Sequence, residues 1–232
     1  MSLEGRAGSV WATLAADLRV PIERDPASRG MLDVLLSYTG VHAVIAHRFI
    51  HALYRTRLPL VPRLLSTWVR FLTGVEIHPG AQLGAGFFID HGMGVVIGET
   101  VEAGRNVTIY QGVTLGGTSL QRGKRHPTLG DNVTVGVGAA VLGAITLGDN
   151  VKVGAGSVVV KDVPPNATVV GIPARVVLQD GRPIRLAGAP PHVDMPDPNA
   201  EALRRLRERL EHVEGRLADL TRRSGNWDDV AI

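Results

Sequence analysis

The sequence predicts a mostly β protein with helical appendages, built around a parallel β-helix. An aliphatic residue recurs at every sixth position over residues 77–159, whereas helices and half-buried strands have periods of 3.6 and 2. Glycines follow many of these positions, where sharp corners need permissive backbone. Hexapeptide repeats are typical of a solenoid of short parallel strands, with the recurring side chain inside. The recurring residues are Ile77, Leu83, Ile89, Val95, Val101, Val107, Val113, Leu129, Val135, Val141, Leu147, Val153 and Val159.

The hexad register shows one break, between Val113 and Leu129. The gap is one hexad plus ten residues, so we expect an inserted loop over residues 116–128. Insertions in repeat proteins often map to functional loops on one face. An accidental pattern would require two separate runs of hexads to arise by chance.

Residues 1–74 are predicted to be helical. A first helix follows Ser9, a second is capped by Ser28, a third covers residues 40–55, and a fourth runs from Pro59 to Gly74. The third helix carries three histidines that can share a face, as metal ligands would. Because no carboxylate or fourth ligand accompanies them, a packed or solvated helix face is favoured. These histidines are His42, His47 and His51.

The strand column is expected to run over about residues 75–161 and to end at the prolines at 164 and 165, which prevent the strand ladder from continuing. The β-helix domain as a whole is expected to cover residues 75–178. A linker over 179–199 leads to a helix over 200–223 and a flexible tail over 224–232. The helix has an unbroken heptad seam, which we expect to pack on copies of itself; the alternative is packing against the β-helix. The seam consists of Leu203, Leu206, Leu210, Val213, Leu217 and Leu220.

Composition limits the classes of function. The 232 residues include no cysteine, which excludes disulfides and thiolate metal sites. There is no signal-peptide layout or apolar run long enough for a membrane span, so we expect a cytoplasmic protein without a membrane partner. The net charge of +3 suits a polyphosphate cofactor or a nucleic acid equally. Much of the positive charge lies in residues 204–223, and we expect no nucleic-acid partner.

Polar residues that could take part in catalysis or binding gather at few places on the predicted β-helix. Glu76 and His91 are fifteen residues apart, close to one eighteen-residue coil, so we expect them in the same sector of neighbouring coils. A carboxylate beside an imidazole can stabilise the imidazolium of a general base. A corner histidine bonded to a backbone carbonyl is the ordinary alternative. A zinc site from His78, His91 and His126 is a third, although the spacing fits no ligand motif.

Four segments resemble the serine O-acetyltransferase family, which makes O-acetylserine from serine and acetyl-CoA in cysteine biosynthesis. The segments are residues 74–80, 89–100, 113–118 and 123–127, and the similarity extends over about residues 20–178. The resemblance implies a left-handed β-helix, homotrimers, and active sites between adjacent subunits with acetyl-CoA along the column. The short N-terminal region favours a single trimer over a hexamer made of two trimers.

The resemblance also implies roles for single residues. His91 would be the general base, with Glu76 standing where the family has aspartate. Asp25 and Asp90 would hold the serine ammonium, and Arg125 with His126 would hold its carboxylate. These assignments agree with charge and with the bidentate geometry of guanidinium.

The acetyl-CoA residues implied by the resemblance follow the same coils, and no metal is expected. Gly117, Thr118, Ala155 and the turn over residues 171–175 would lie along the CoA arm, with Lys161 and Arg175 at its phosphates. Val137 departs from the alanine common in the family.

The C-terminal Ile232 matches a family tail that enters the active site of O-acetylserine sulfhydrylase. The resemblance further implies feedback inhibition by cysteine at the serine site. Two other functions stay open. One is a hexapeptide-repeat O-acetyltransferase for a sugar or another hydroxylated acceptor. The other is a trimeric scaffold that binds a partner through its tail.

Overall fold

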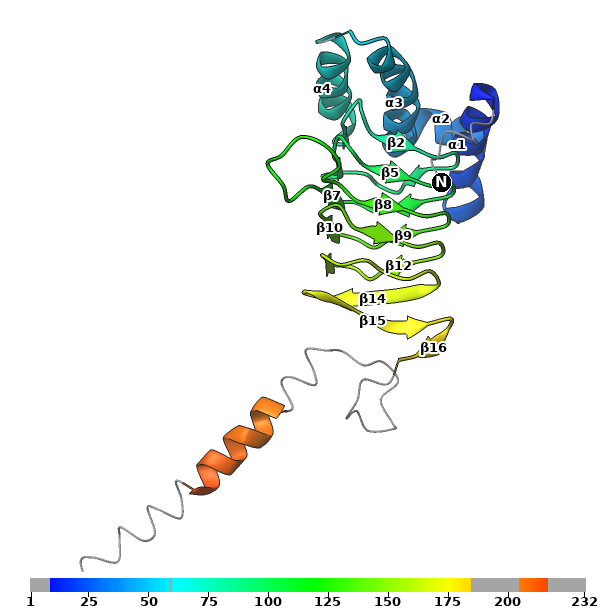
Figure 1. Ribbon diagram of the computed structural model, residues 1–232. Coiled ribbons are helices and arrows are strands. Elements are labelled where there is room, and N and C mark those ends of the chain that lie inside the picture. The colour runs from blue at the N-terminus through cyan, green and yellow to red at the C-terminus, as the bar shows by residue number, and fades with distance from the viewer. Residues whose placement is uncertain (1–8, 59, 185–204, 217–232) are drawn as a thin grey trace, which may run out of the picture. The chain divides into compact units, whose positions relative to one another are not determined.

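The computed structural model describes residues 9–58, 60–184 and 205–216. The chain divides into two compact units, residues 1–188 and 189–232. In the first unit a column of short strands is covered at one end by four helices (Figure 1).

The column is a parallel β-helix with three sheets, which we name A, B and C. Sheet A consists of β1 (Glu76–Ile77), β4 (Val96–Ile97), β7 (Thr114–Gly116), β10 (Ala140–Leu142) and β13 (Val158–Val159). Sheet B consists of β2 (Gln82–Leu83), β5 (Glu102–Ala103), β8 (Thr128–Leu129) and β11 (Thr146–Leu147). Sheet C consists of β3 (Phe88–Ile89), β6 (Thr108–Ile109), β9 (Thr134–Val135), β12 (Lys152–Val153) and β14 (Ala167–Gly171), followed by the antiparallel β15 (Ala174–Gln179) and β16 (Arg182–Pro183).

All thirteen hexad residues are buried inside the column, but they occupy two kinds of position. Ile77, Ile89 and the residues from Leu129 onward are the inward-facing second residues of strands. Val95 and Val113 instead precede strands, at the inward end of a corner. Both kinds of position hold inward-facing apolar side chains. The six-residue spacing therefore continues in the sequence although the position within the repeat changes.

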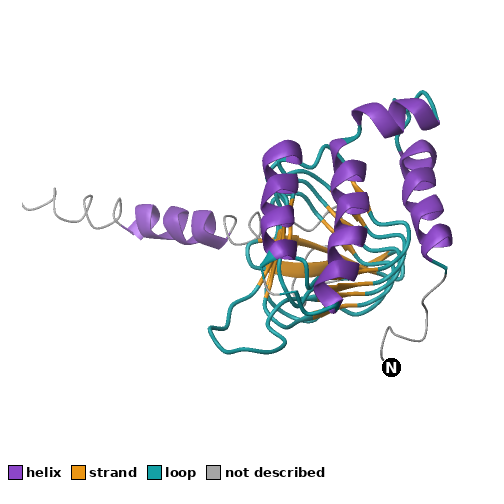
Figure 2. Ribbon diagram, turned by 90° about the horizontal axis from the view of Figure 1, so that it is seen from above, coloured by secondary structure: helices purple, strands orange, loops and turns teal. Residues whose placement is uncertain are grey.

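The register therefore shifts twice, and the prediction of a single break is wrong. Each coil has three corners, named here A–B, B–C and C–A after the sheets they join. The first C–A corner spans residues 90–95, whereas the later ones span only 110–113, 136–139 and 154–157. These two additional residues lie in the corner that carries His91. The larger insertion, residues 117–127, is an A–B corner and projects from the column (Figures 1 and 2).

The four helices are α1 (Val10–Arg24), α2 (Met31–Ser37), α3 (Thr39–Arg55) and α4 (Val61–Thr73), and they lie over one end of the column (Figure 2). Gly30, not Ser28, is the N-cap of α2. Ser9 is the N-cap of α1 but makes no side-chain capping bond. Gly74 ends α4 with a left-handed φ of 72°. Pro59 lies outside the described residues.

A buried ion pair joins the helices to the column. Arg48 Nε lies 3.0 Å from Asp17 Oδ2, and the Arg48 guanidinium also donates to the carbonyls of Leu83 and Gly84. Asp17 Oδ1 in turn accepts the Gly86 N–H at 2.8 Å. Every charge of this pair thus has a partner, as a buried pair requires. α1 and α3 are therefore held on the first coil.

The three histidines of α3 bond to backbone carbonyls. His42 Nε2 lies 2.6 Å from the Leu35 oxygen, His47 Nε2 3.1 Å from that of Ala81, and His51 Nδ1 2.8 Å from that of Pro79. They are packing residues of the helix, as the favoured interpretation holds.

A ladder of amide side chains follows the B–C corner down the column. Each member has a positive φ, between 50° and 60°. The four asparagines each donate a side-chain N–H to the residue below, and the carboxylate of Asp180 accepts the last of these bonds. The successive bonds are 3.3, 3.2, 2.8 and 3.0 Å long. Asparagine suits both tasks, because it tolerates the left-handed region and carries an amide. The ladder consists of Asn106, Asn132, Asn150, Asn166 and Asp180.

In the second unit the structure describes a helix over residues 205–216. Arg207 and Glu211 form an (i, i+4) ion pair at 3.3 Å, and the exposed side chains of Leu206, Leu210 and Val213 follow the predicted seam. The other seam residues lie outside the described residues. None of the helices in the described ranges has the length and apolar character needed to cross a membrane.

Candidate active site

His91 occupies a strained turn at the first C–A corner. Its φ is 60°, and the Gly92 N–H donates to the Asp90 carbonyl at 2.7 Å, closing a three-residue turn around it. A left-handed conformation is costly for a residue with a Cβ, and such strain collects at functional sites. Gly92 also has a positive φ, and a Cβ there would lie 2.8 Å from Val75 Cγ2. The turn presents the exposed imidazole on the edge of sheet A.

Asp25 is held on the same side of the molecule, just after α1. Its carboxylate accepts the Tyr38 hydroxyl at 2.5 Å and the Ala27 N–H at 2.8 Å. The Tyr38 bond is the main reason that the pKa of Asp25 is lowered, and positive charge on His91 lowers it further. The same bond raises the pKa of Tyr38 to about 12. Asp25 therefore stays ionised, within electrostatic range of His91.

Close contact between α3 and the column places the start of α3 beside the His91 turn. A Cβ on Gly40 would collide with the Ile89 carbonyl oxygen, so only glycine allows the approach. The neighbouring Thr39 hydroxyl donates to the His91 carbonyl at 3.4 Å.

Glu76 does not bond to His91 in the described part of the chain. Its carboxylate instead forms an ion pair with Arg70 of α4 at 2.8 Å. The expected carboxylate–imidazole pair is thus replaced by a bond to a cation, and the role of Glu76 toward His91 stays a prediction.

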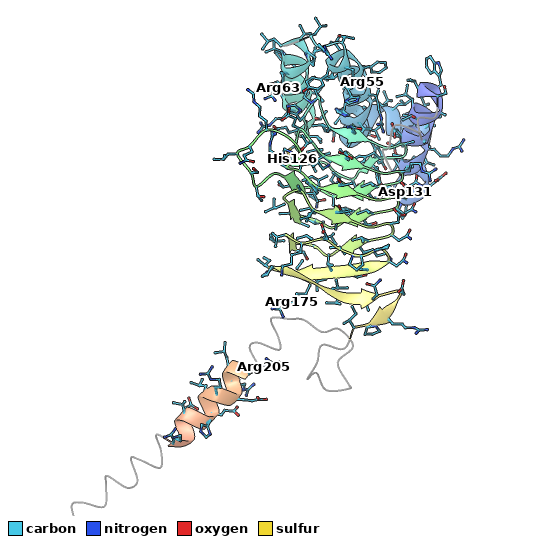
Figure 3. The ribbon with its side chains drawn as sticks, in the orientation of Figure 1. Arg55, Arg63, His126, Asp131, Arg175 and Arg205 are labelled. Carbon is cyan, nitrogen blue, oxygen red and sulfur yellow. The ribbon has the colours of Figure 1, made fainter. Side chains whose placement is uncertain are left out.

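Arg125 and His126 lie at the end of the projecting A–B loop, and Figure 3 labels His126. Thr100 holds them in place. Its Oγ1 accepts the N–H groups of Arg125 and His126, both at 3.1 Å. Glu99 Oε2 accepts from Arg125 Nη2 at 2.5 Å, and this bond lowers the pKa of Glu99. Lys124 Nζ donates to the Thr100 carbonyl at 2.8 Å.

The tautomer of His126 follows from its bonds. The Thr100 N–H donates to Nδ1 at 3.2 Å, and the Thr100 hydroxyl lies 2.9 Å from the same atom. Nδ1 is therefore an acceptor, and the proton of the neutral ring is on Nε2. Burial, followed by the charge of Arg125, lowers the pKa of His126 and keeps the ring neutral. Glycine at 98 is required, because a Cβ there would overlap the ring.

The predicted site residues divide between the two edges of sheet A. Asp90, His91 and Ala155 lie in C–A corners, whereas Gly117, Thr118, Arg125, His126 and Lys161 lie in A–B corners. Arg175 lies on β15 near the far end of the column (Figure 3). Sheet A separates the two groups in one chain, so a single chain does not bring all the predicted site residues together. We call the two groups half-sites.

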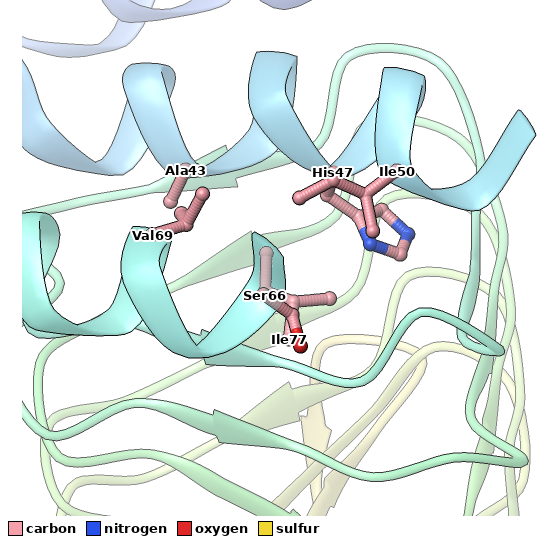
Figure 4. A pocket seen from close by; sticks show the side chains of 6 residues that line it. All are labelled: Ala43, His47, Ile50, Ser66, Val69 and Ile77. Atoms are coloured by element: carbon pink, nitrogen blue, oxygen red, sulfur yellow. The ribbon is translucent and has the colours of Figure 1, made fainter. Parts of the chain in front are cut away.

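A small cavity lies elsewhere, between α3, α4 and the first coil (Figure 4). Burial lowers the pKa of His47, which lines it, to about 3, and His47 Nδ1 has no hydrogen-bond partner among the described residues. The cavity contains none of the predicted site residues. Its lining residues are Ala43, His47, Ile50, Ser66, Val69 and Ile77.

Sequence reasoning missed Tyr38 and Thr100. Thr100 lies in one of the four family-like segments, yet nothing in the sequence shows that its hydroxyl reaches a loop twenty-five residues later. Among the described residues, no three histidines, aspartates or glutamates lie close enough to hold a metal ion.

Comparison with known proteins shows the family. Over 211 residues, 91% of this chain, the sequence is 58% identical to a serine acetyltransferase of Synechococcus elongatus, 85% of which is covered. The chain belongs to the serine acetyltransferase family. Residues 126–161 also match the family described as bacterial transferase hexapeptide (six repeats).

Solved structures of serine acetyltransferases agree with this assignment. The Neisseria gonorrhoeae enzyme in complex with serine is 47% identical, with a TM-score of 0.69 over 72% of this chain and 68% of that one. The Brucella abortus enzyme in complex with coenzyme A is 42% identical, with a TM-score of 0.70 over 72% of this chain and 67% of that one. The fold is accordingly the left-handed parallel β-helix.

Proposed function

We propose that this serine acetyltransferase transfers the acetyl group of acetyl-CoA to the hydroxyl of L-serine. The products are O-acetylserine and CoA, in the first step of cysteine biosynthesis from serine. One observation carries the proposal: the chain presents acids beside an imidazole on one edge of sheet A, and a guanidinium beside a neutral imidazole on the other. Together these groups complement an amino acid that carries a hydroxyl.

Each half-site has a separate task in the reaction. Asp25 and Asp90 bind the serine ammonium, and Arg125 binds its carboxylate together with the Nε2–H of His126. His91 removes the hydroxyl proton while the serine oxygen attacks the thioester carbonyl. As the carbon–sulfur bond breaks, His91 returns that proton to the CoA thiolate.

We propose that Gly117, Thr118 and Ala155 line the arm of acetyl-CoA, and that Lys161 and Arg175 reach its phosphates. Ala155 lies on the His91 edge, whereas the first two lie on the Arg125 edge. The cofactor would thus occupy the same boundary between copies as serine.

We further propose that the enzyme is a single homotrimer with shared sites. If the C–A edge of each chain meets the A–B edge of the next, repetition of that contact closes a ring in which sheet A faces the axis. Three of the five outward residues of sheet A support this, because Val96, Ala140 and Val158 are apolar, whereas Glu76 and Thr114 are polar. The corresponding residues of sheet B are polar: Gln82, Glu102, Thr128 and Thr146.

The test combines two impaired variants, assayed at a serine concentration below the KM of Arg125→Ala. His91→Ala should lower kcat by about 10²- to 10⁴-fold, as loss of a general base does. Arg125→Ala should mainly raise the KM for serine. Co-expression of equal amounts of both chains should restore about a quarter of the wild-type sites, since a working site needs His91 from one chain and Arg125 from the next. Thiol release from acetyl-CoA measures the rate.

If the co-expressed chains are no more active than the two variants assayed separately, each site lies within one chain. A panel of hydroxylated acceptors, sugars included, tests the substrate in the same assay. Faster turnover of a sugar than of serine would contradict the proposal.

Three further proposals concern regulation, a protein partner and location. Cysteine is proposed to inhibit by competing with serine, and a solved serine acetyltransferase is a complex with cysteine; inhibition that serine does not relieve would contradict this. Ile232 lies outside the described residues and is proposed to bind O-acetylserine sulfhydrylase, so its deletion should abolish co-purification. The reaction is proposed to be cytoplasmic, where acetyl-CoA is available.

A further inference from the structure

Gln111 carries a side-chain amide that forms no bond within the described part of the chain. It lies in the C–A corner between β6 and β7, directly below the corner that carries His91. Its Oε1 is shielded from solvent, and neither this oxygen nor the amide nitrogen has a hydrogen-bond partner among the described residues. Buried polar atoms in native proteins nearly always have a partner, so this amide requires an explanation. A ligand that brings its own amide would supply the partner.

The backbone places Gln111 in a stack of residues along the C–A edge. The Gly112 N–H donates to the Met93 carbonyl at 2.9 Å, and the Gly138 N–H donates to the Gln111 carbonyl at 2.9 Å. The same bond repeats one coil lower, at 2.8 Å. Of the four stacked residues, Gln111 alone has a polar side chain. The stack consists of Met93, Gln111, Val137 and Ala155, from the His91 corner downward.

A glycine follows each stacked residue and leaves the edge open. All four glycines have a positive φ, between 64° and 75°. A Cβ added at Gly138 or Gly156 would meet nothing within 4 Å, so space remains beside the backbone below Gln111. Val137 and Ala155 are exposed there as well. An extended ligand can therefore lie along this edge and reach the amide of Gln111. The glycines are Gly94, Gly112, Gly138 and Gly156.

We propose that Gln111 binds the amide of acetyl-CoA that is nearest to the thioester. This inference rests on the proposed function, in which the CoA arm passes Ala155 and the thioester meets His91. Two methylene groups join that amide nitrogen to the sulfur, so an extended link spans about 5 Å from the thioester carbon to the nitrogen. Successive coils are about 4.8 Å apart. A thioester at the His91 corner therefore leaves its nearest amide level with Gln111.

The chemistry of the two amides is complementary. Gln111 Oε1 accepts the N–H of the ligand amide, while Nε2 donates to the ligand's carbonyl oxygen. The last torsion of a glutamine side chain is soft, so a rotation brings the shielded Oε1 to the edge without breaking a bond to any described residue. The ligand amide is the same in acetyl-CoA, in the transition state and in CoA. The bond therefore lowers the KM for acetyl-CoA and leaves kcat unchanged.

The first experiment replaces Gln111 with leucine, which is similar in size and has no amide. Loss of the amide pair should raise the KM for acetyl-CoA and the Kd for CoA by about five- to tenfold. The kcat and the KM for serine should stay at their wild-type values. Steady-state kinetics and isothermal titration with CoA measure these constants. Gln82→Leu, at an exposed glutamine on the outward face of sheet B, should behave as wild type.

Thermal unfolding of Gln111→Leu checks whether the amide has a structural role. Removal of an unpartnered acceptor should leave the Tm at or above that of wild type, because no protein bond is lost. A Tm well below that of wild type would show that another part of the assembly bonds to the amide, and this would overturn the inference.

The second experiment identifies the chemical group that Gln111 binds. S-acetyl-N-acetylcysteamine keeps the thioester and its nearest amide, whereas S-butyl thioacetate carries the thioester on a plain alkyl chain. Wild type should favour the first donor, and the ratio of the two kcat/KM values should fall by about five- to tenfold in Gln111→Leu. Because the chain has no cysteine, a thiol reagent reports only the thiol that the reaction releases.

The outcomes separate this inference from the proposed function. An equal ratio in both proteins would show that Gln111 does not bind the amide, while turnover of serine with acetyl-CoA still supports the proposed function. A fall in kcat by one factor for every donor would assign the Gln111 amide to the thioester oxygen, which also overturns the inference. If wild type itself does not acetylate serine, the proposed function is wrong.

Discussion

At the scale of single residues, Thr100 links the two functions of the A–B half-site. Its hydroxyl accepts two backbone N–H groups and donates to His126 Nδ1, so one side chain sets both the path of the loop and the tautomer of the His126 ring. Asp25 depends in a similar way on Tyr38. In the proposed site both are positioning residues, because they act through the groups that we propose bind serine.

Thr100→Val should therefore weaken serine binding. It keeps the shape of the side chain but leaves two N–H donors without an acceptor, at about 1 kcal/mol for each bond. We expect the KM for serine to rise by about tenfold or more, with the KM for acetyl-CoA little changed. Steady-state kinetics against both substrates measures this. Thr100→Ser should recover the wild-type value, and a uniform loss of kcat in both variants would argue against the role.

His47 should make the fold sensitive to acid. Burial lowers its pKa from 6.5 to about 3, so below pH 6.5 the unfolded chain takes up a proton that the folded chain does not. The free energy of unfolding therefore falls as the pH drops from 6.5 toward 3. Between pH 7 and pH 5 this group alone contributes a loss of about 2 kcal/mol.

His47→Gln removes that titration but retains an N–H for the Ala81 carbonyl. Urea unfolding at pH 7 and pH 5 should show a smaller pH difference for the variant than for wild type. Equal differences would mean that other groups cause the acid sensitivity.

At the scale of elements, the amide ladder at the B–C corner joins backbone strain to side-chain bonding. Asn132 has a φ of 59° and bonds to Asn106 above and Asn150 below. Asn132→Ala should destabilise the folded chain by about 1–2 kcal/mol, because alanine is strained in the left-handed region and forms no ladder bond. Thermal or urea unfolding measures it. Asn132→Gly relieves the backbone strain alone, so it should recover part of the loss; no recovery would assign the whole effect to the ladder.

The elements also show where the sequence was informative. Every predicted hexad residue is buried, because a narrow column needs an aliphatic side chain at each inward position. The same regularity hid the first register shift. The residue before a strand and the second residue of the strand are both apolar, so the six-residue spacing continues across the shift. The exposure of the large apolar side chains of α4, such as Trp68 and Phe71, was not predicted either. An amphipathic pattern does not show what its apolar side contacts.

At the scale of the whole molecule, the sequence offers candidate site residues but does not show how they are arranged in space. The ammonium and carboxylate ligands were assigned by resemblance, and one chain places them on two edges of sheet A. Distance between corners is not encoded in local spacing, because it depends on how copies meet. The expected pair of Glu76 and His91 illustrates the same limit: a coil of twenty residues, not eighteen, separates β1 from β4, and Arg70 competes for the carboxylate.

The widened corner around His91 offers a guide for other hexapeptide chains. A C–A corner of ordinary length has too few residues to form an additional turn, so a turn that holds an imidazole away from the surface of the column needs a longer corner. Where one rung of a solenoid is longer than its neighbours by only a couple of residues, that rung is the first place to look for the group that moves a proton. Such a search would require neither an alignment nor a bound ligand.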